Sequence, residues 1–356
     1  MKCWSGAYQA FEKPLSRGHG SVSYRAVTAR ERSYNHTRNL LLTALTATML
    51  LITGCNQNKR KVIAVIPKGT SHLFWVSVQA GALSAGKEFN VDIEWNGPAA
   101  ETDYTRQIQI VDSCIARHVD GIVLAAGEKK ALVAPMERAV AAGIPVTVFD
   151  SGLESDKYMT FLATNNYEAG KMAAATLAKL LNDKGKIAMV AHEPGSQSTM
   201  DRERGFEDAI KQSFPGMQIV ATQFGHSDRS KAMGATENIL TAHPELDGIF
   251  ASSEPSSVGA SLALKSRKLN GKVKLVAFDS SDGMIEDLQA GVIDAMVVQD
   301  PFRMGHDAVK TIIDKWNGNP PPKRIDLSAR VVTKADLEKP EIKALLHPDV
   351  EQYLKK

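Results

Sequence analysis

The stretch that decides the fold is KVIAVIPKGTSHLFWVSVQAGALSAGKEF, residues 61–89. Residues 61–66 are mostly apolar and β-branched and are followed by Pro67, which predicts a buried strand. A polar loop from Lys68 to His72 comes next, and apolar residues then recur at helical spacing from Phe74 onward. Ligands of open α/β sheets bind beyond the carboxyl ends of the strands, so this loop is the first place to expect function.

The rest of the chain repeats this unit of strand, loop and helix. Further strands are predicted at 91–95, 121–126, 146–149, 161–164, 186–191, 218–224, 248–251, 274–278 and 295–299, with extended chain at 325–333. Helices are predicted at 104–117, 130–142, 165–181, 201–214, 228–242, 258–267, 284–289 and 304–316, with a short one around 342–346. This alternation predicts parallel, doubly wound α/β sheets with right-handed crossovers. Because the pattern restarts near Thr164–Asn166, we expect two lobes with a ligand cleft between the carboxyl ends of their strands.

The amino-terminal residues have the pattern of an export signal. The apolar run LLLTALTATMLLI at 40–52 follows basic residues; it is shorter than the ~20 residues of a membrane span and suits a signal peptide. The run ends in LITGC at 51–55, which resembles a bacterial lipobox. We therefore expect residues 1–54 to be removed, Cys55 to carry lipid and residues 55–60 to form a tether, giving a membrane-anchored lipoprotein of the periplasm or cell envelope. A signal peptide with a chance cysteine is the alternative, and the long leader indicates an over-extended gene start or an unusual extension.

The charge and cysteine content exclude two broad classes. Without the seven basic and two acidic residues of 1–54, the chain holds 36 basic and 38 acidic residues, so its formal charge changes from +3 to −2. There is therefore no bulk electrostatic case for nucleic-acid binding. Of the three cysteines, only Cys114 stays free once the signal is removed and Cys55 is lipidated, so no internal disulfide is expected. We interpret Cys114 as a small buried residue of a helix.

Polar and aromatic side chains gather where the cleft is expected. The candidates from loops, helix starts and strand ends are Ser71, His72, Asp150, Arg204, Asp279 and Gln299, with Phe74 and Trp75 as aromatic faces. Carboxylates and amides form paired hydrogen bonds to vicinal hydroxyls, and aromatic rings stack on the apolar face of a sugar, so this set suits a small polyhydroxyl ligand. Each also has a plainer interpretation: the aspartates as turn formers, the aromatics as core, the glutamine as loop chemistry and the histidine as a loop hydrogen-bonder.

Known catalytic and metal-binding motifs do not occur in the sequence. GALSAGKE at 81–88 departs from a P-loop because Glu88 replaces the Ser/Thr and the stretch lies within a predicted helix. No GxGxxG follows a strand, GxSxG, HExxH and paired CxxC motifs are absent, and the nine histidines lack ligand spacing. We predict a binding protein without metal or cofactor rather than an enzyme, while acid–base chemistry by His72, Asp150 and Asp279 stays open.

A set of short motifs is spread along residues 60–335: Phe74-Trp75 before Val76-Ser77, DGIV at 120–123, AGIPV at 142–146 leading to Asp150, RERGF at 202–206, TAHPE at 241–245, Phe278-Asp279 and Gln299. With these motifs the chain resembles the ribose-type periplasmic sugar-binding proteins of ABC importers, which are related to the sensor domains of lac-repressor-like regulators. This resemblance implies two lobes, 60–164 with 300–325 and 165–299 with 326–340, and a tail, 341–356. Three crossovers are implied near Thr164, Gln299 and Ile325–Leu327.

The resemblance also implies roles for the site residues. It places ring stacking at Phe74 and Trp75 and hydroxyl binding at Asp150, Arg204, Asp279 and Gln299. His72, Ser151, Ser227 and Ser253 depart from the residues that the family often has there, with Glu254 as a compensating side chain, which predicts a ligand larger than a pentose or differently hydroxylated. The implied mechanism is closure of a monomer's lobes around a monosaccharide or polyol, followed by docking on an ABC permease in the inner membrane.

Three other functions compete with this interpretation. A transcriptional regulator needs a helix-turn-helix before residue 60, where the sequence instead has the apolar run and lipobox. A receptor that presents a bound sugar to a sensor kinase or chemoreceptor stays open, as does an enzyme with an unlisted arrangement of residues.

Overall fold

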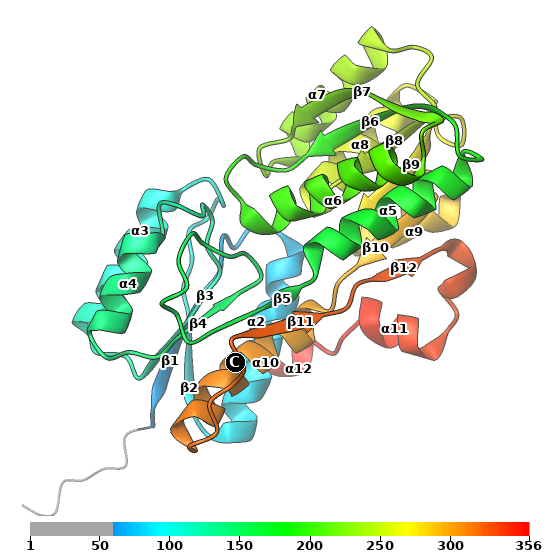
Figure 1. Cartoon of the computed structure of the whole chain (residues 1–356). Coiled ribbons are helices and arrows are strands. Elements are labelled where there is room, and N and C mark those ends of the chain that lie inside the picture. Colours follow the sequence, from blue (N-terminus) through cyan, green and yellow to red (C-terminus); the bar gives the residue numbers. More distant parts are fainter. Residues whose placement is uncertain (1–59, 356) are drawn as a thin grey trace, which may run out of the picture. The chain divides into compact units, whose positions relative to one another are not determined.

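The computed structural model describes residues 60–355 (Figure 1). The predicted signal peptide, the lipobox at Cys55 and nearly all of the tether lie outside these residues. Within the described part of the chain, no helix has the length and apolar character needed to cross a membrane.

The first lobe is built on a parallel sheet with the strand order β11-β5-β4-β3-β1-β2. Its strands are β1 (Val62–Ile66), β2 (Asp92–Trp95), β3 (Gly121–Leu124), β4 (Val146–Phe149), β5 (Thr160–Thr164) and β11 (Arg324–Leu327). Its helices are α2 (Leu73–Phe89), α3 (Tyr104–Ala116), α4 (Val133–Ala141) and α10 (Pro301–Trp316). The alternation in β1 fixes the two layers: Ile63 and Val65 pack in the core that includes α2 and α10, and Ala64 and Ile66 in the core that includes α3 and α4.

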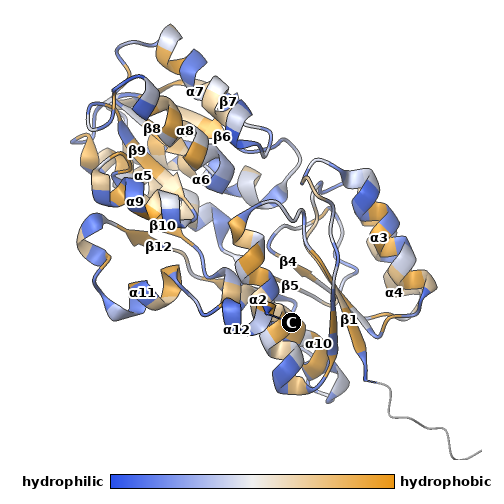
Figure 2. Cartoon of the chain, turned by 180° about the vertical axis from the view of Figure 1, so that it is seen from behind, coloured by the Kyte–Doolittle hydropathy of each residue, from blue (hydrophilic) through white to orange (hydrophobic). Residues whose placement is uncertain are grey.

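The second lobe repeats this plan with the strand order β12-β10-β9-β8-β6-β7. Its strands are β6 (Gly185–Ala191), β7 (Met217–Phe224), β8 (Gly248–Ala251), β9 (Lys274–Phe278), β10 (Ala295–Val298) and β12 (Arg330–Val332). Its helices are α5 (Asn166–Leu180), α6 (Gln197–Ser213), α7 (Arg229–Ala242), α8 (Glu254–Ser266) and α9 (Asp282–Ala290). The predicted doubly wound parallel sheets are confirmed, with one exception: β12 runs antiparallel to β10. Apolar strands lie between helices that are apolar on the faces covering them (Figure 2).

The chain passes between the two sheets at three places: from β5 to α5, from β10 to α10, and from β11 to β12. Several helices begin earlier than predicted; α6 starts at Gln197 rather than 201, and α8 at Glu254 rather than 258. In α8 the signal is Ser253, whose side chain accepts from the backbone N–H of Ser256, with Pro255 in the first turn. The predicted interpretation of Cys114 is confirmed, since it is free and fully buried on α3.

The carboxyl-terminal residues contact both lobes. Helix α11 (Pro340–Leu346) contains the predicted short helix and packs Ile342 into a core of the second lobe. A further helix, α12 (Glu351–Leu354), lies against α2 of the first lobe, and the ring of Tyr353 is 5.8 Å from that of Phe302 on α10. The tail therefore adds a further contact between the lobes, in addition to the three crossovers.

Each lobe contains a pair of helices that cross at glycines. A Cβ on Gly81 of α2 would overlap the carbonyl oxygen of Phe302 on α10, and one on Gly305 would overlap that of Val78. In the second lobe, Gly170 and Gly205 bring α5 and α6 together in the same way. Because α2 and α6 both begin at the cleft, these crossings set where their first turns stand.

We predict opposite effects for two glycine-to-alanine changes. Gly305→Ala forces α2 and α10 apart and should lower the free energy of unfolding by about 1–3 kcal/mol or more, since overpacking against backbone is hard to relieve. Gly234→Ala in α7 meets no atom within 4 Å and should raise it by roughly 0.5–1 kcal/mol through helix propensity. Urea unfolding of both variants measures this; a Gly305→Ala protein as stable as wild type would contradict the assigned crossing.

Candidate functional site

The candidate site lies between the lobes, where the carboxyl ends of their strands meet. Its walls are Lys68, His72, Phe74, Trp75, Glu101 and Asp150 from the first lobe, and His192, Ser198, Thr199, Arg202, Ser253, Glu254, Pro255, Asp279 and Gln299 from the second lobe and the hinge. The cavity left between them is about 30 Å³, room for about two waters. The two lobes are therefore in direct contact around this small space.

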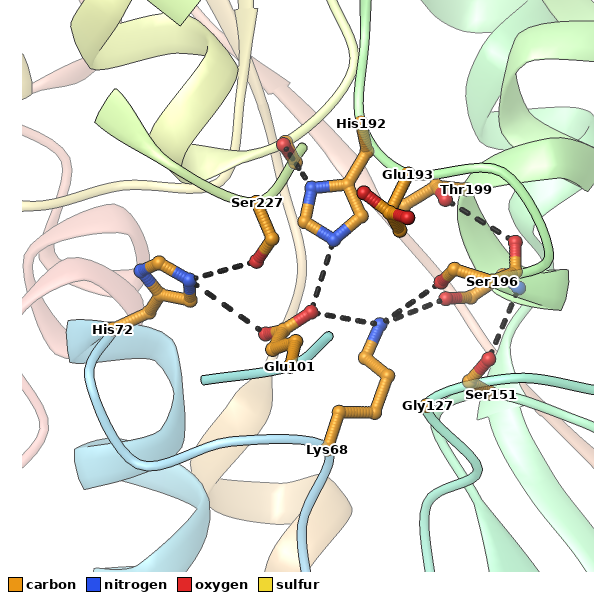
Figure 3. A network of polar contacts seen from close by, with 12 residues as sticks. Lys68, His72, Glu101, Gly127, Ser151, His192, Glu193, Ser196, Thr199 and Ser227 are labelled. Carbon is orange, nitrogen blue, oxygen red and sulfur yellow. Dashed lines mark hydrogen bonds and ion pairs between the residues drawn. The ribbon is translucent and has the colours of Figure 1, made fainter. Parts of the chain in front are cut away.

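The ammonium of Lys68 is buried at the centre of the contact between lobes (Figure 3). Its Nζ lies 3.2 Å from Oδ2 of Asp150 and 3.8 Å from Oε2 of Glu101, and it donates to the hydroxyls of Ser196 and Ser198 on the other lobe at 3.3 Å each. Burial alone lowers the pKa of Lys68, but the two carboxylates outweigh it and raise that pKa, so the group stays charged.

Glu101 joins the lobes a second time. Its Oε2 is 2.9 Å from Nε2 of His192 at the end of β6, while its Oε1 accepts from the indole N–H of Trp75 at 2.7 Å. Burial acts to raise the pKa of Glu101, but Lys68 and His192 hold it well below the usual range. Burial also lowers the pKa of His192. The pair is therefore a carboxylate facing a neutral imidazole across the cleft.

Two aspartates occupy equivalent positions in the two lobes. Asp150 follows β4 and Asp279 follows β9, and each has a positive φ, 55° and 68°, which is uncommon for a residue with a side chain. Asp279 accepts from the backbone N–H of Glu254 and from Nε2 of Gln299 at 2.7 Å. Burial raises the pKa of Asp150 despite Lys68 beside it.

Arg202, and not the predicted Arg204, is the arginine on the cavity wall. Arg202 is 2% exposed and donates to Oδ1 of Asn166 and to the carbonyl of Ser252, with its guanidinium 3.4 Å from the centre of the Phe278 ring. Arg204 instead pairs with Asp201 on the exposed face of α6, outside the cavity. The prediction that Arg204 lies in the cleft was wrong because α6 turns 100° per residue. Its buried face carries Phe206 and therefore also Arg202, four positions earlier.

The structure brings eight of the twelve predicted site residues to the cavity wall: His72, Phe74, Trp75, Asp150, Ser253, Glu254, Asp279 and Gln299. Ser71 is exposed away from it, and Ser227 reaches the site indirectly, 3.0 Å from Nε2 of His72. Ser151 is buried behind the wall, where its hydroxyl accepts from the backbone N–H of Ser198. Trp75 is 2% exposed and belongs to the first-lobe core, edge-on to Phe74, so the structure favours its plainer interpretation as a core residue over a stacking face.

Sequence reasoning missed seven wall residues: Lys68, Glu101, His192, Ser198, Thr199, Arg202 and Pro255. Lys68 and His192 stand within two residues of the carboxyl ends of β1 and β6, and this position was a usable signal. Glu101 gave none, since it lies in an irregular loop. Of the described residues, no group of three or more His, Cys, Asp or Glu side chains is placed to hold a metal ion.

Comparison with known proteins bears on this arrangement. Residues 63–320 match the model of the periplasmic binding protein domain. The chain belongs to this family. It is 34% identical to a carbohydrate transporter solute-binding protein from Agrobacterium radiobacter solved with D-arabinose, with a TM-score of 0.79 over 81% of this chain and 99% of that one.

Two further members of the family are similar along their length. A solute-binding protein of an ABC transporter from Agrobacterium vitis, solved with D-fucose, is 36% identical, with a TM-score of 0.78 over 80% of this chain and 100% of that one. The ribose import binding protein of Bacillus subtilis is 26% identical, over 82% of this chain and 97% of the relative. The predicted family is confirmed, and these relatives are named as binding proteins of sugar import rather than as enzymes.

We predict that Glu203 makes stability depend on pH. Its Oε1 accepts from the backbone of His192 and the hydroxyl of Ser252, and burial raises its pKa from 4.5 to about 7. The folded chain then binds this proton more tightly than the unfolded chain, so its contribution to stability is lost as pH rises from 4.5 through about 7. Glu203→Gln should remove that decline, on the order of 1–3 kcal/mol between pH 5 and 8. Urea unfolding at several pH values tests this, and parallel curves for the two proteins would contradict it.

Proposed function

We propose that the protein captures a monosaccharide or related polyol in the cleft between its lobes and delivers it to an ABC permease. The observation that carries the proposal is a pair of buried oxygens on the cavity wall, Oε2 of Glu254 and Oε1 of Gln299, that form no hydrogen bond within the described chain. Beside them, Oδ2 of Asp150 is paired with the ammonium of Lys68 alone. Buried polar atoms in this state are costly, so a ligand that supplies several hydroxyl donors compensates for them. The sugars held by the related binding proteins are ligands of this chemistry.

The mechanism is closure of the two lobes on the ligand. Lys68 and Glu101 on one lobe contact serines and His192 on the other, so the closed state has polar contacts of its own. A sugar held between the lobes adds hydrogen bonds that exist only when both walls reach it, and this differential affinity shifts the population toward closure. The closed form then presents a surface made by both lobes to the permease.

The rest of the proposal concerns location and state. We propose that the protein works in the periplasm as a monomer, held at the membrane by lipid on Cys55. The family supports the periplasm. The lipobox pattern at 51–55 supports the anchor.

We predict that both strand-end aspartates are needed for binding. A thermal-shift screen of residues 60–356, which form one compact unit, identifies a binding monosaccharide or polyol. Asp150→Asn or Asp279→Asn should then weaken the binding of that ligand by about 100-fold or more, since each variant loses charge-assisted hydrogen bonds to it. Titration calorimetry measures the loss, with Asp156→Asn, an exposed change outside the cavity, as the matched control. Unchanged affinity in both site variants would place the ligand elsewhere.

We also predict that one cysteine anchors the protein. Cys55→Ser should move the protein expressed from its full gene from the membrane fraction to the soluble periplasmic fraction, because the thiol that carries the lipid is gone. Cys114→Ser, a change in a buried thiol, should leave it with the membrane. A Cys55→Ser protein that stays in the membrane fraction would refute the lipid anchor.

A further inference from the structure

The cavity wall carries more acidic than basic groups. Four of its side chains are carboxylates, Glu101, Asp150, Glu254 and Asp279, and two are permanent cations, Lys68 and Arg202. All six are at most 7% exposed. Protonation of both wall histidines, His72 and His192, would only make the numbers of positive and negative side chains on the wall equal. Burial lowers the pKa of His192, which opposes its protonation. Arg229 pairs with Glu254 from outside the wall, and when it is included the carboxyl groups still outnumber the permanent cations by four to three. Screening by solvent is weak in such a place.

Both cations are already engaged by the protein. Lys68 lies between Asp150 and Glu101 and donates to two serines. Arg202 uses three of its five N–H groups on Asn166 and Ser252, and its planar face covers Phe278. A ligand carboxylate therefore finds only two N–H groups of Arg202 that are not donated to the protein, and a lysine that already pairs with two carboxylates.

Glu254 is the acidic group of the wall that a donor on the ligand would stabilise most. It is 1% exposed and opens α8; Arg229 pairs with its Oε1, while its Oε2 has no hydrogen-bond partner and lies 3.6 Å from Nδ1 of His72. The other charged group near it is Asp279, whose carboxylate adds to the negative charge. Burial raises the pKa of Glu254 in spite of Arg229, which indicates that its charge is not fully compensated.

We propose, on the basis of the proposed function, that the cleft selects sugars by charge: it favours a sugar bearing an amine, which Glu254 binds, over its neutral parent, and it excludes the corresponding acid. An ammonium brings three donors to a wall on which Oε2 of Glu254 and Oε1 of Gln299 are acceptors without a hydrogen bond. A carboxylate brings only acceptors and a like charge. A neutral sugar lies between the two, because its hydroxyls both donate and accept.

The test compares sugars that differ at one carbon only. Calorimetry of residues 60–356 is carried out with D-galactose, 6-amino-6-deoxy-D-galactose, D-galactosamine and D-galacturonate, or with the same derivatives of whichever neutral sugar the screen identifies. At least one amine should bind about tenfold more tightly than the neutral sugar, and the acid at least about tenfold more weakly. An acid as tight as the neutral sugar, or two amines no tighter than it, overturns the inference. A neutral sugar that binds while the order fails leaves the proposed function intact, whereas failure of every neutral sugar rejects both.

A variant assigns the selection to Glu254. Glu254→Gln keeps the shape of the side chain and its acceptor for Arg229 but removes the charge. The ratio of amine to neutral affinity should then fall to about one, while Glu286→Gln, an exposed carboxyl change on α9, should leave the ratio as in wild type. A ratio in Glu254→Gln that equals the wild-type ratio overturns the assignment to this residue. Because the readout is a ratio within one protein, a loss of stability common to all ligands does not alter it.

Discussion

A buried ammonium is the interaction on which the closed structure depends. Lys68 is almost fully buried, and a charge in that position is tolerated only when it is paired and hydrogen-bonded. Its partners come from three separate segments: Asp150 after β4, Glu101 in a loop, and serines at the start of α6 in the other lobe. Because the partners of Lys68 lie on both lobes, pairing this one side chain fixes the position of one lobe against the other. Replacing the serines by a ligand's oxygens is chemically a small step, which is how a contact between lobes can also be part of a binding site.

The lobes can meet in this way because each one fixes its own strand ends and helix starts. The glycine crossings hold α2 against α10 and α5 against α6 at backbone contact distance, and the first turns of α2 and α6 then reach the cleft from opposite sides. The two aspartates with left-handed backbone stand at matching positions of the two sheets. Strain of this kind is retained where the surrounding hydrogen bonds fix the conformation, as those from Glu254 and Gln299 do at Asp279.

The way in which the wall uses its own hydrogen-bond donors and acceptors also explains the chemistry proposed for the ligand. Where the protein supplies donors, as at Arg202, most of them are used internally. Where it supplies acceptors, at Glu254 and Gln299, some are left for a ligand. Hydroxyl groups fit such a wall and amines fit it better. A negatively charged group on the ligand is repelled by the buried carboxylates of the wall.

The sequence by itself determined the alternation of strands and helices, the division near Thr164 and half of the polar wall, since local periodicity and strand-end positions depend only on neighbours along the chain. Asp150, Asp279 and Gln299 were accessible in this way. Only the tertiary structure decided between Arg202 and Arg204, turned Trp75 toward the core, and brought Glu101 from an irregular loop to His192 some ninety residues away. These outcomes depend on which side of a helix is covered and on which segments meet across the cleft. Burial and long-range pairing are properties of the packed molecule, so no short stretch of sequence contains them.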